Sequence, residues 1–289
     1  MSKLFRPKEY FRPATIGEAT SLLSRYGERA RIYAGGTDLL VAKPPEAECI
    51  VDIASLPMDY IRKDGEGVKI GALSTPHSIG TSSLFKEGAL GVLVEAARAL
   101  GHWGTVKNMA TIGGNVCSVP SADFPPALLV LDAKAKAVGP SGERTIPLEQ
   151  FFVHVRKTAL KSDELLLELQ VPNQPPHTGT AFEKIGRVTA DIALVNAAAR
   201  ITLGPNGLCE EARIALGAVA PTPIRAKRAE NMLKGKRVDE ALVEEASKTA
   251  ADETKPISDV RASAEYRREV SKVLVKRALQ KALERAKEA

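Results

Sequence analysis

Two glycine pairs constrain the fold of this chain more than any other sequence feature. Gly35 and Gly36 follow an apolar run at residues 30–34, and Gly113 and Gly114 stand among small and hydroxyl residues. Glycine has no Cβ, so it adopts positive φ and lets a ligand approach its backbone closely. Consecutive N–H groups turned to one side form a concave anion site. A lone Gly-Gly pair is more often a turn, but two pairs with polar neighbours favour a binding role.

The first pair is expected between a strand and a helix. Residues 16–26 are predicted to form an amphipathic helix that starts after Thr15, an N-cap with Glu18 at the capping-box spacing. Residues 30–34 are typical of a short buried strand, and residues 39–41 resume a helix-like apolar turn. Such a junction directs backbone donors toward an anion, which is what a pyrophosphate needs.

The remaining patterns predict an α+β chain with two domains. Before a boundary near residues 172–179, we expect strands at 49–53, 61–63, 68–72, 134–138, 144–147 and 165–171, and helices after Thr75 and at 90–100 and 127–131. The second glycine pair is expected in a loop between these helices. Beyond the boundary, we expect an antiparallel meander at 181–185, 193–203 and 211–219, and helices at 224–233, 239–251 and 262–287. The last helix carries an apolar stripe typical of a core face: Val270, Val273, Leu274, Ala278 and Leu279.

Composition indicates a soluble cytoplasmic protein with a substantial core. The chain has 289 residues, 44% of them hydrophobic, with no signal-peptide pattern at its start and no apolar run that approaches a membrane span. The net charge is +6, but the basic residues are interleaved with acidic ones, and only 4% of residues are aromatic. Both features argue against nucleic-acid binding. The three cysteines, Cys49, Cys117 and Cys209, lie far apart, so neither a disulfide framework nor a metal cluster is expected within this chain.

The common nucleotide and hydrolase motifs do not occur. No G-x-G-x-x-G follows a strand, and the chain contains neither a P-loop nor a G-x-S-x-G elbow. From the residues alone, the prediction is a first domain that holds a phosphate-bearing ligand between two glycine loops. Asp123, in a run of small and polar residues, is suited to bind hydroxyl groups.

Six segments, spread in order over nearly the whole chain, carry a specific resemblance. They are residues 34–40 (AGGTDLL), 110–117 (ATIGGNVC), 121–126 (SADFPP), 182–184 (FEK), 217–223 (GAVAPTP) and 259–268 (DVRASAEYRR). The chain resembles the FAD-binding medium subunit of molybdenum hydroxylases, the xanthine dehydrogenase and carbon monoxide dehydrogenase family. The resemblance implies an FAD domain of the vanillyl-alcohol oxidase/p-cresol methylhydroxylase type at residues 1–177, with subdomains of about 1–56 and 57–177. It implies a smaller antiparallel-sheet-plus-helices domain of the carbon monoxide dehydrogenase flavoprotein type at 178–289.

The resemblance also implies a set of FAD-binding residues. The two glycine motifs would cradle the pyrophosphate, Asp123 would contact the ribityl or diphosphate region, and Lys184 would lie near the isoalloxazine. Residues 186–191 would form a mobile segment beside the flavin ring, and the backbone of Leu165 would meet the adenine end. The full set is Arg31, Ile32, Tyr33, Ala34, Gly35, Gly36, Thr37, Asp38, Thr111, Ile112, Gly113, Gly114, Asn115, Ser118, Asp123, Leu165 and Lys184.

The implied role is an oxidoreductase subunit in an electron relay. A large subunit with a molybdopterin cofactor would hydroxylate substrate, a small subunit with [2Fe–2S] clusters would pass electrons, and this subunit's FAD would deliver them to NAD, a quinone or oxygen. The partners imply a heterotrimer or a dimer of heterotrimers. No cysteine-rich insertion for a [4Fe–4S] cluster is present, which disfavours the 4-hydroxybenzoyl-CoA reductase variant. Two alternatives remain: a stand-alone FAD-dependent reductase or oxidase of the same fold, and a scaffold without flavin, which the intact glycine motifs disfavour.

Overall fold

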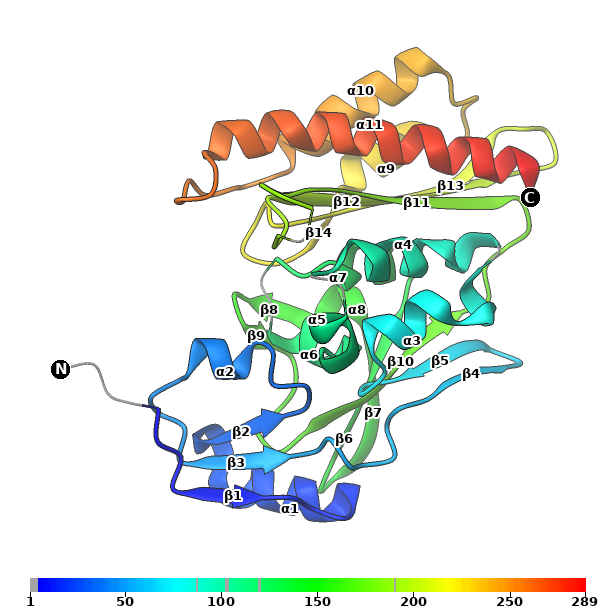
Figure 1. Cartoon of the computed structure of the whole chain (residues 1–289). Coiled ribbons are helices and arrows are strands. Elements are labelled where there is room, and N and C mark those ends of the chain that lie inside the picture. Colours follow the sequence, from blue (N-terminus) through cyan, green and yellow to red (C-terminus); the bar gives the residue numbers. More distant parts are fainter. Residues whose placement is uncertain (1–4, 87, 102–103, 119–120, 190) are drawn as a thin grey trace.

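Within the described residues, sheets of three, five and four strands and the helices between them form successive layers along the molecule (Figure 1). The computed structural model describes residues 5–86, 88–101, 104–118, 121–189 and 191–289. A small parallel sheet lies at one end, a five-stranded antiparallel sheet in the middle, and a four-stranded antiparallel sheet under three helices at the other end. The mixed α and β architecture predicted from the sequence is confirmed. Within the described residues, no helix is both long enough and apolar enough to cross a membrane.

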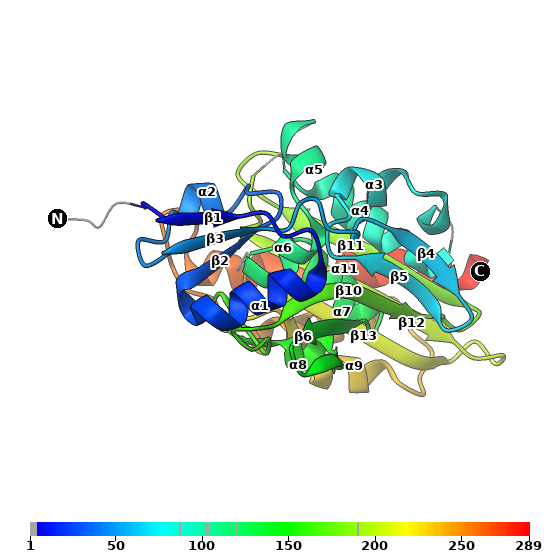
Figure 2. The ribbon, with the colours of Figure 1, turned by 90° about the horizontal axis from the view of Figure 1, so that it is seen from below.

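The N-terminal sheet is parallel, with strand order β1 (Glu9–Phe11), β3 (Cys49–Asp52), β2 (Ala30–Tyr33). Helix α1 (Ile16–Tyr26) packs across it, as the view from below shows (Figure 2). The predicted bounds of α1 are confirmed, and Thr15 Oγ1 accepts a hydrogen bond of 3.1 Å from the Glu18 N–H. The short strand β1 was not predicted.

The middle sheet has the strand order β4, β5, β10, β6, β7, and all its pairings are antiparallel. The strands are β4 (Ile61–Asp64), β5 (Gly67–Gly71), β6 (Lys134–Gly139), β7 (Gly142–Pro147) and β10 (Leu165–Pro172). The strands predicted at 61–63 and 68–72 are β4 and β5, which form a hairpin. Its turn is held by the Asp64 carboxylate, which accepts hydrogen bonds from the N–H groups of Glu66 and Gly67. A separate two-stranded hairpin, β8 (Phe152–His154) and β9 (Lys157–Thr158), was not predicted.

Short helices connect the strands of the first two sheets along the chain. They are α2 (Leu39–Ala42), α3 (Pro76–Thr81), α4 (Gly91–Ala99), α5 (Thr105–Met109), α6 (Ile112–Ser118), α7 (Phe124–Val130) and α8 (Leu148–Phe151), with 3₁₀ turns at Gly27–Arg29, Ser83–Phe85 and Gly88–Leu90. The helix predicted after Thr75 is α3, which Thr75 caps with a reciprocal capping box and which begins at a proline. The second glycine pair was expected in a loop, and this is wrong: both glycines lie in the first turn of α6.

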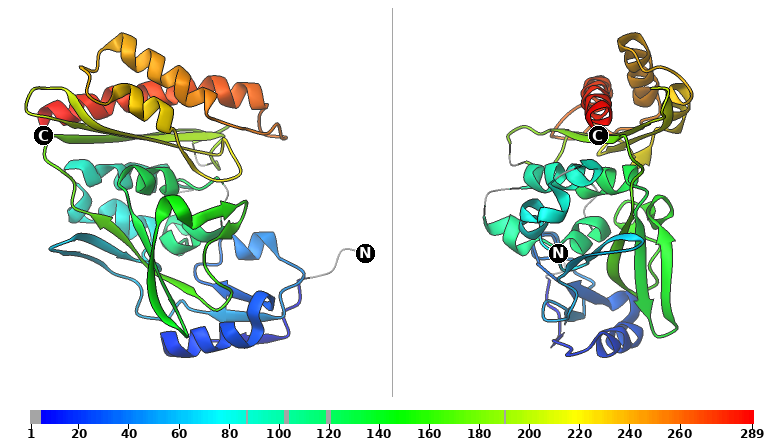
Figure 3. Two further views of the ribbon diagram at one scale, coloured as in Figure 1. Left: turned by 180° about the vertical axis from the view of Figure 1, so that it is seen from behind. Right: turned by 90° about the vertical axis from the view of Figure 1, so that its right-hand side faces the viewer.

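The C-terminal sheet is the predicted antiparallel meander: β11 (Thr178–Ile185), β12 (Val195–Leu203), β13 (Cys209–Gly217) and a short edge strand β14 (Ile224–Arg225). Helices α9 (Lys227–Leu233) and α11 (Ala264–Glu288) pack on its outer face, and α10 (Glu240–Asp252) packs against these two helices. Helices α4 and α7 lie against its inner face (Figure 3). Helices on both sides explain why every residue of β12 is buried and why its sequence shows no polar alternation.

Two details of this half differ from the prediction. The segment 224–233 was predicted as one helix, but its first two residues pair with the edge of β13 and the helix begins at Lys227. In α11 the apolar stripe faces the core through Leu274, Ala278 and Leu279, but Val273 is 46% exposed. With about 3.6 residues per turn, Val273 lies on the side of α11 opposite the buried face.

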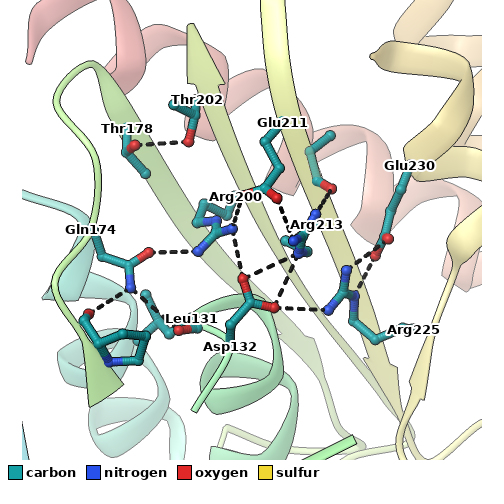
Figure 4. Close-up of polar contacts among 12 residues, drawn as sticks. Leu131, Asp132, Gln174, Thr178, Arg200, Thr202, Glu211, Arg213, Arg225 and Glu230 are labelled. Atoms are coloured by element: carbon teal, nitrogen blue, oxygen red, sulfur yellow. Dashed lines mark hydrogen bonds and ion pairs between the residues drawn. The ribbon is translucent and has the colours of Figure 1, made fainter.

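The seam between the inner helices and the C-terminal sheet is held by an arginine–carboxylate cluster around Asp132 (Figure 4). Asp132 follows α7 with φ of 53°, and its carboxylate lies 2.8 Å from Arg200 Nη2, 3.1 Å from Arg213 Nε and 3.2 Å from Arg225 Nη1. The side chains of Arg200 and Arg225 are only 3% and 7% exposed. Asp132 therefore pairs with guanidinium groups from three strands of the opposite layer, and Glu211 and Glu230 of that layer pair with the same arginines.

Candidate functional site

The first glycine motif forms the turn between β2 and α2, at the junction predicted from the sequence. Gly36 has φ of 70°, a conformation that favours glycine. A Cβ on Gly35 would lie 1.6 Å from the carbonyl oxygen of Met109. Glycine at position 35 is therefore required because another backbone segment, the one just before the second motif, passes directly over it.

The backbone N–H groups of this turn are available to a ligand. In the part of the chain that the structure describes, Gly35, Gly36, Thr37 and Asp38 donate no backbone hydrogen bond, and all four residues are half-buried. A buried peptide N–H normally has a partner, so a run of accessible free donors is typical of an anion-binding concavity. These donors fit the phosphate groups of a nucleotide cofactor.

The second glycine motif is built differently from what was expected. The N–H groups of Ile112 and Gly113 donate to the carbonyls of Ser74 and Ala72, each at 2.9 Å. A Cβ on Gly113 would lie 2.7 Å from the Ala72 carbonyl oxygen, so this glycine lets α6 pack on the chain that follows β5.

The next donors of α6 are also satisfied within the chain. Thr111 Oγ1 accepts from Gly114 N–H at 3.0 Å, and the Thr111 carbonyl accepts from Asn115 N–H at 2.9 Å. The second motif thus offers a half-buried surface at Gly114 and Asn115 in place of a row of free N–H groups. Because Gly35 contacts the segment before α6, the two motifs form adjoining walls of one site.

A buried ion pair lies between the second motif and the C-terminal sheet. Lys184 Nζ, on β11, lies 2.7 Å from Asp123 Oδ2, with side chains 7% and 6% exposed. Asn196 Nδ2, on β12, donates to Asp123 Oδ1 at 2.9 Å, and Lys184 also donates to the Ala99 carbonyl at 2.9 Å. Burial raises the pKa of the Asp123 carboxyl, while Lys184 and Asn196 act in the opposite direction. The structure therefore brings together two of the predicted site residues that are distant in the sequence.

Three other predicted site residues have side chains directed elsewhere. The Arg31 guanidinium bonds Glu46 at 2.6 Å and the Ala30 carbonyl at 2.8 Å, on the far side of β2. Leu165 is 1% exposed, and its side chain belongs to the core below the N-terminal sheet, which leaves only its backbone for a ligand. Ser118 donates its hydroxyl to the Gly114 carbonyl at 2.7 Å, inside α6.

The segment expected to move beside the flavin connects β11 to β12. Arg187 Nε lies 2.7 Å from Asp191 Oδ2, and this pair closes the turn. Val188 and Ile192 are 65% and 53% exposed. Residue 190, within this expected segment, lies outside the described residues.

One residue at the site was missed by the sequence analysis. Arg156, at the tip of the β8–β9 hairpin, bonds both carboxylate oxygens of Asp38, at 2.7 and 3.3 Å, and the carbonyl of Ser118 at 3.0 Å. A pocket beside it is lined by Ser118, Phe152, His154 and Thr158, among others. The hairpin lacks a typical turn sequence, so no local signal pointed to Arg156.

Comparison with known proteins assigns both halves of the chain. Residues 5–174 match the model of the FAD binding domain in molybdopterin dehydrogenase, and residues 180–282 match that of the CO dehydrogenase flavoprotein C-terminal domain. The chain is 34% identical to the carbon monoxide dehydrogenase medium chain of Hydrogenophaga pseudoflava, over 94% of this chain and 95% of that one. It is 32% identical to the xanthine dehydrogenase FAD-binding subunit of Escherichia coli O157:H7, over 97% of each. A crystal structure of the Hydrogenophaga pseudoflava carbon monoxide dehydrogenase superposes with a TM-score of 0.92 at 34% identity, covering 97% of this chain and 98% of that one.

Proposed function

This chain belongs to the family of FAD-binding medium subunits of molybdenum hydroxylases, and on that premise we propose that its FAD lies between the two glycine motifs and the Asp123–Lys184 pair. The free N–H groups of residues 35–38 are the observation that carries this assignment, because unpaired peptide donors carry partial positive charge and suit the acceptor oxygens of a pyrophosphate. Bound FAD would supply the redox chemistry, since it accepts and donates electrons, and the protein contributes binding and electrostatics.

Each part of the site has a distinct task in this proposal. The turn at residues 35–38 binds the diphosphate through its backbone. Gly114 and Asn115 present a close wall without bulky side chains, and the backbone near Leu165 meets the adenine end. Asp123 and Lys184 supply a carboxylate acceptor and an ammonium donor at the junction with residues 186–191, where the isoalloxazine would lie. We place the boundary between the FAD-binding and C-terminal domains at residues 177 and 178.

The wider role is that of a relay in a larger enzyme. Related proteins bear the names medium chain and FAD-binding subunit, and electrons would reach this chain from [2Fe–2S] clusters in a small subunit. A large molybdopterin subunit would oxidise the substrate, and an acceptor such as NAD or a quinone would take the electrons. A heterotrimer or a dimer of heterotrimers in the cytoplasm fits this division of labour. A stand-alone reductase or oxidase is the alternative.

A matched pair of glycine variants tests the cofactor assignment. Gly36 and Gly235 have φ of 70° and 76°, so alanine imposes similar backbone strain at both, on the order of 1 kcal/mol. At Gly36 the added Cβ would also lie 2.4 Å from the Tyr33 ring, a residue of the same proposed site, whereas at Gly235 it would meet no atom within 4 Å. Only Gly36 belongs to the proposed site. The purified chain should carry visible flavin bands, Gly36→Ala should lower the FAD content at least several-fold, and Gly235→Ala should keep it. Equal flavin content in the two folded variants would refute the assignment, and a wild-type chain that cannot be loaded with FAD would refute the function.

The stand-alone alternative predicts a different result. Electron transfer from a small-molecule donor to an acceptor by the isolated chain, at a rate that added partner subunits do not raise, would favour that alternative. Co-purification with iron–sulfur and molybdenum subunits, with turnover only in the complex, supports the relay.

A further inference from the structure

We propose that Arg156 is a positioning residue for the FAD site, which locks the first glycine motif against α6 through the carboxylate of Asp38. This inference rests on the proposed function, because it assumes that residues 35–38 bind the FAD diphosphate. Arg156 is remote in sequence from both motifs, and neither its residue type nor its neighbours suggested a role there.

The contacts of Arg156 join three separate segments. Its guanidinium bonds Asp38 with both terminal nitrogens, Nη1 to Oδ2 at 2.7 Å and Nη2 to Oδ1 at 3.3 Å. Nη1 also donates to the Ser118 carbonyl at 3.0 Å, near the C-terminal end of α6. Such two-nitrogen pairing restricts the orientation of a carboxylate in a way that a lysine ammonium does not.

Asp38 is placed so that this contact acts on the cofactor turn. It stands immediately before α2, where an aspartate side chain usually caps the helix, yet it makes no capping hydrogen bond. Its carboxylate pairs with Arg156 instead. Because the N–H of Asp38 is one of the free donors of the turn, fixing the side chain also fixes the direction of the neighbouring donors.

The backbone at Arg156 is consistent with a role beyond the hairpin itself. His154 pairs with Lys157, so Val155 and Arg156 form a two-residue turn, and Arg156 has φ of 56°. Glycine or asparagine is favoured at such a position, and a long side chain is disfavoured there. An arginine in this conformation makes the turn less favourable than glycine would, so the presence of arginine is explained better by the guanidinium contacts than by hairpin stability.

This geometry allows a variant that separates positioning from folding. Arg156→Gly removes the guanidinium and relieves the left-handed backbone, so the apoprotein should melt at the same temperature as wild type or slightly higher. Its affinity for FAD should fall about 10-fold or more, measured by titrating the full-length apoprotein with FAD and following flavin fluorescence. Arg156→Asn, which also tolerates the left-handed region, serves as a second variant if the glycine chain folds poorly. Arg228→Gln, which removes an exposed guanidinium from an ion pair of the C-terminal half, is the control for loss of an arginine charge and should bind FAD as wild type does.

A double-mutant cycle with Asp38→Asn tests whether Arg156 acts through Asp38. If it does, the double variant should bind FAD about as weakly as the single variant that has the lower affinity. Arg156→Lys should have an FAD affinity between those of Arg156→Gly and the wild type. Additive losses in the cycle would overturn the positioning role, as would wild-type affinity in Arg156→Gly or a fall in apoprotein melting temperature that accounts for the lost binding. Failure of the wild-type chain itself to bind FAD would instead refute the proposed function, so the two failures are distinguishable.

Discussion

Lys184 and Asp123 form a buried ion pair, with 2.7 Å between Nζ and Oδ2, that joins the C-terminal sheet to the segment before α7. Both side chains are at most 7% exposed, so neither charge is well hydrated in the folded chain. A buried pair of this kind contributes little net stability, but removing one partner leaves the other charge buried and unpaired. The pair is a structural link between layers, and in the proposed function it would also be a polar contact for the cofactor.

Removing Lys184 should therefore destabilise the chain more than removing both partners. Lys184→Met leaves the Asp123 carboxylate buried without its cation, and we expect a loss of about 3–5 kcal/mol in the free energy of unfolding. Lys184→Met combined with Asp123→Asn should recover a substantial part of that loss, because no isolated charge remains. Urea unfolding of the single and double variants measures the coupling. Simple addition of the two single losses would contradict this account of the pair.

Gly35 and Gly114 should respond differently to alanine. A Cβ on Gly35 meets the Met109 carbonyl oxygen at 1.6 Å, which forces the two motifs apart, so Gly35→Ala should cost roughly 3 kcal/mol or more and abolish FAD retention. A Cβ on Gly114 approaches only Thr111 Oγ1, at 3.0 Å, and alanine is favoured over glycine in a helix. Gly114→Ala should change the free energy of unfolding by less than about 1 kcal/mol.

A larger side chain at position 114 separates the effect on packing from the effect on cofactor contact. Gly114→Val, which adds more bulk on the proposed cofactor wall, should lower FAD content while the chain remains folded. Circular dichroism melting and flavin absorbance of each purified variant give the two readings. A Gly35→Ala chain with the melting temperature of the wild type would show that the close approach of the two motifs is not required for stability.

The Asp132 cluster should be sensitive to loss of the Asp132 charge, although Glu211 and Glu230 also pair with its arginines. Asparagine tolerates the left-handed φ of 53° at this position, so Asp132→Asn changes the charge while the backbone remains accessible. Arg200 and Arg225 would then lie nearly buried with weaker neutralisation. Because Asp132 is itself 38% exposed, we expect a loss of about 2 kcal/mol, below the range for fully buried pairs.

An exposed ion pair provides the comparison for Asp132. Glu48, which pairs with Arg29 at 3.0 Å, is 40% exposed, and Glu48→Gln should cost less than about 1 kcal/mol. Urea unfolding of both variants gives the comparison. Equal losses would mean that Asp132 acts as an ordinary surface charge.

Local chemistry predicted much of the fold. The capped helix α1, the strand–turn–helix junction at Gly35 and Gly36, and the C-terminal meander depend on periodicity and turn residues within short stretches of chain. β1 is only three residues long, and the sequence offered no alternation from which to infer it.

The contacts of the site could not be predicted in the same way. Gly35 is required by Met109, Asp132 gathers arginines from three later strands, and Arg156 reaches back to Asp38. Each is a pairing between residues that are distant in sequence, and neither residue type nor spacing encodes it. The second glycine pair shows the same limit, because only the packing of α6 against Ala72 and Ser74 reveals that its N–H groups are already bonded.

Asp259 should contribute a pH-dependent part of the stability. Its carboxylate accepts hydrogen bonds from Arg261 Nη2 at 2.6 Å and from the buried Arg267 at 2.8 Å. The Arg261 guanidinium, then the neighbouring backbone N–H groups and the charge of Arg267, hold the pKa of this carboxyl well below its usual range. A depressed carboxyl pKa stabilises the folded state above the unfolded-state value, near 3.9, and this contribution is lost as the pH falls toward the folded-state value.

Replacing this carboxylate should therefore flatten the acid side of the stability profile. Asp259→Asn removes the titrating group and leaves Arg267, which is 1% exposed and also donates to the Leu194 carbonyl at 2.7 Å, without its counter-ion. At pH 7 the variant should be less stable than wild type by about 1–3 kcal/mol, and the difference should shrink as the pH falls below about 4. Urea unfolding at a series of pH values measures both curves. Parallel curves would show that Asp259 titrates alike in the folded and unfolded chains, and a variant as stable as wild type at pH 7 would show that Arg267 does not depend on this carboxylate.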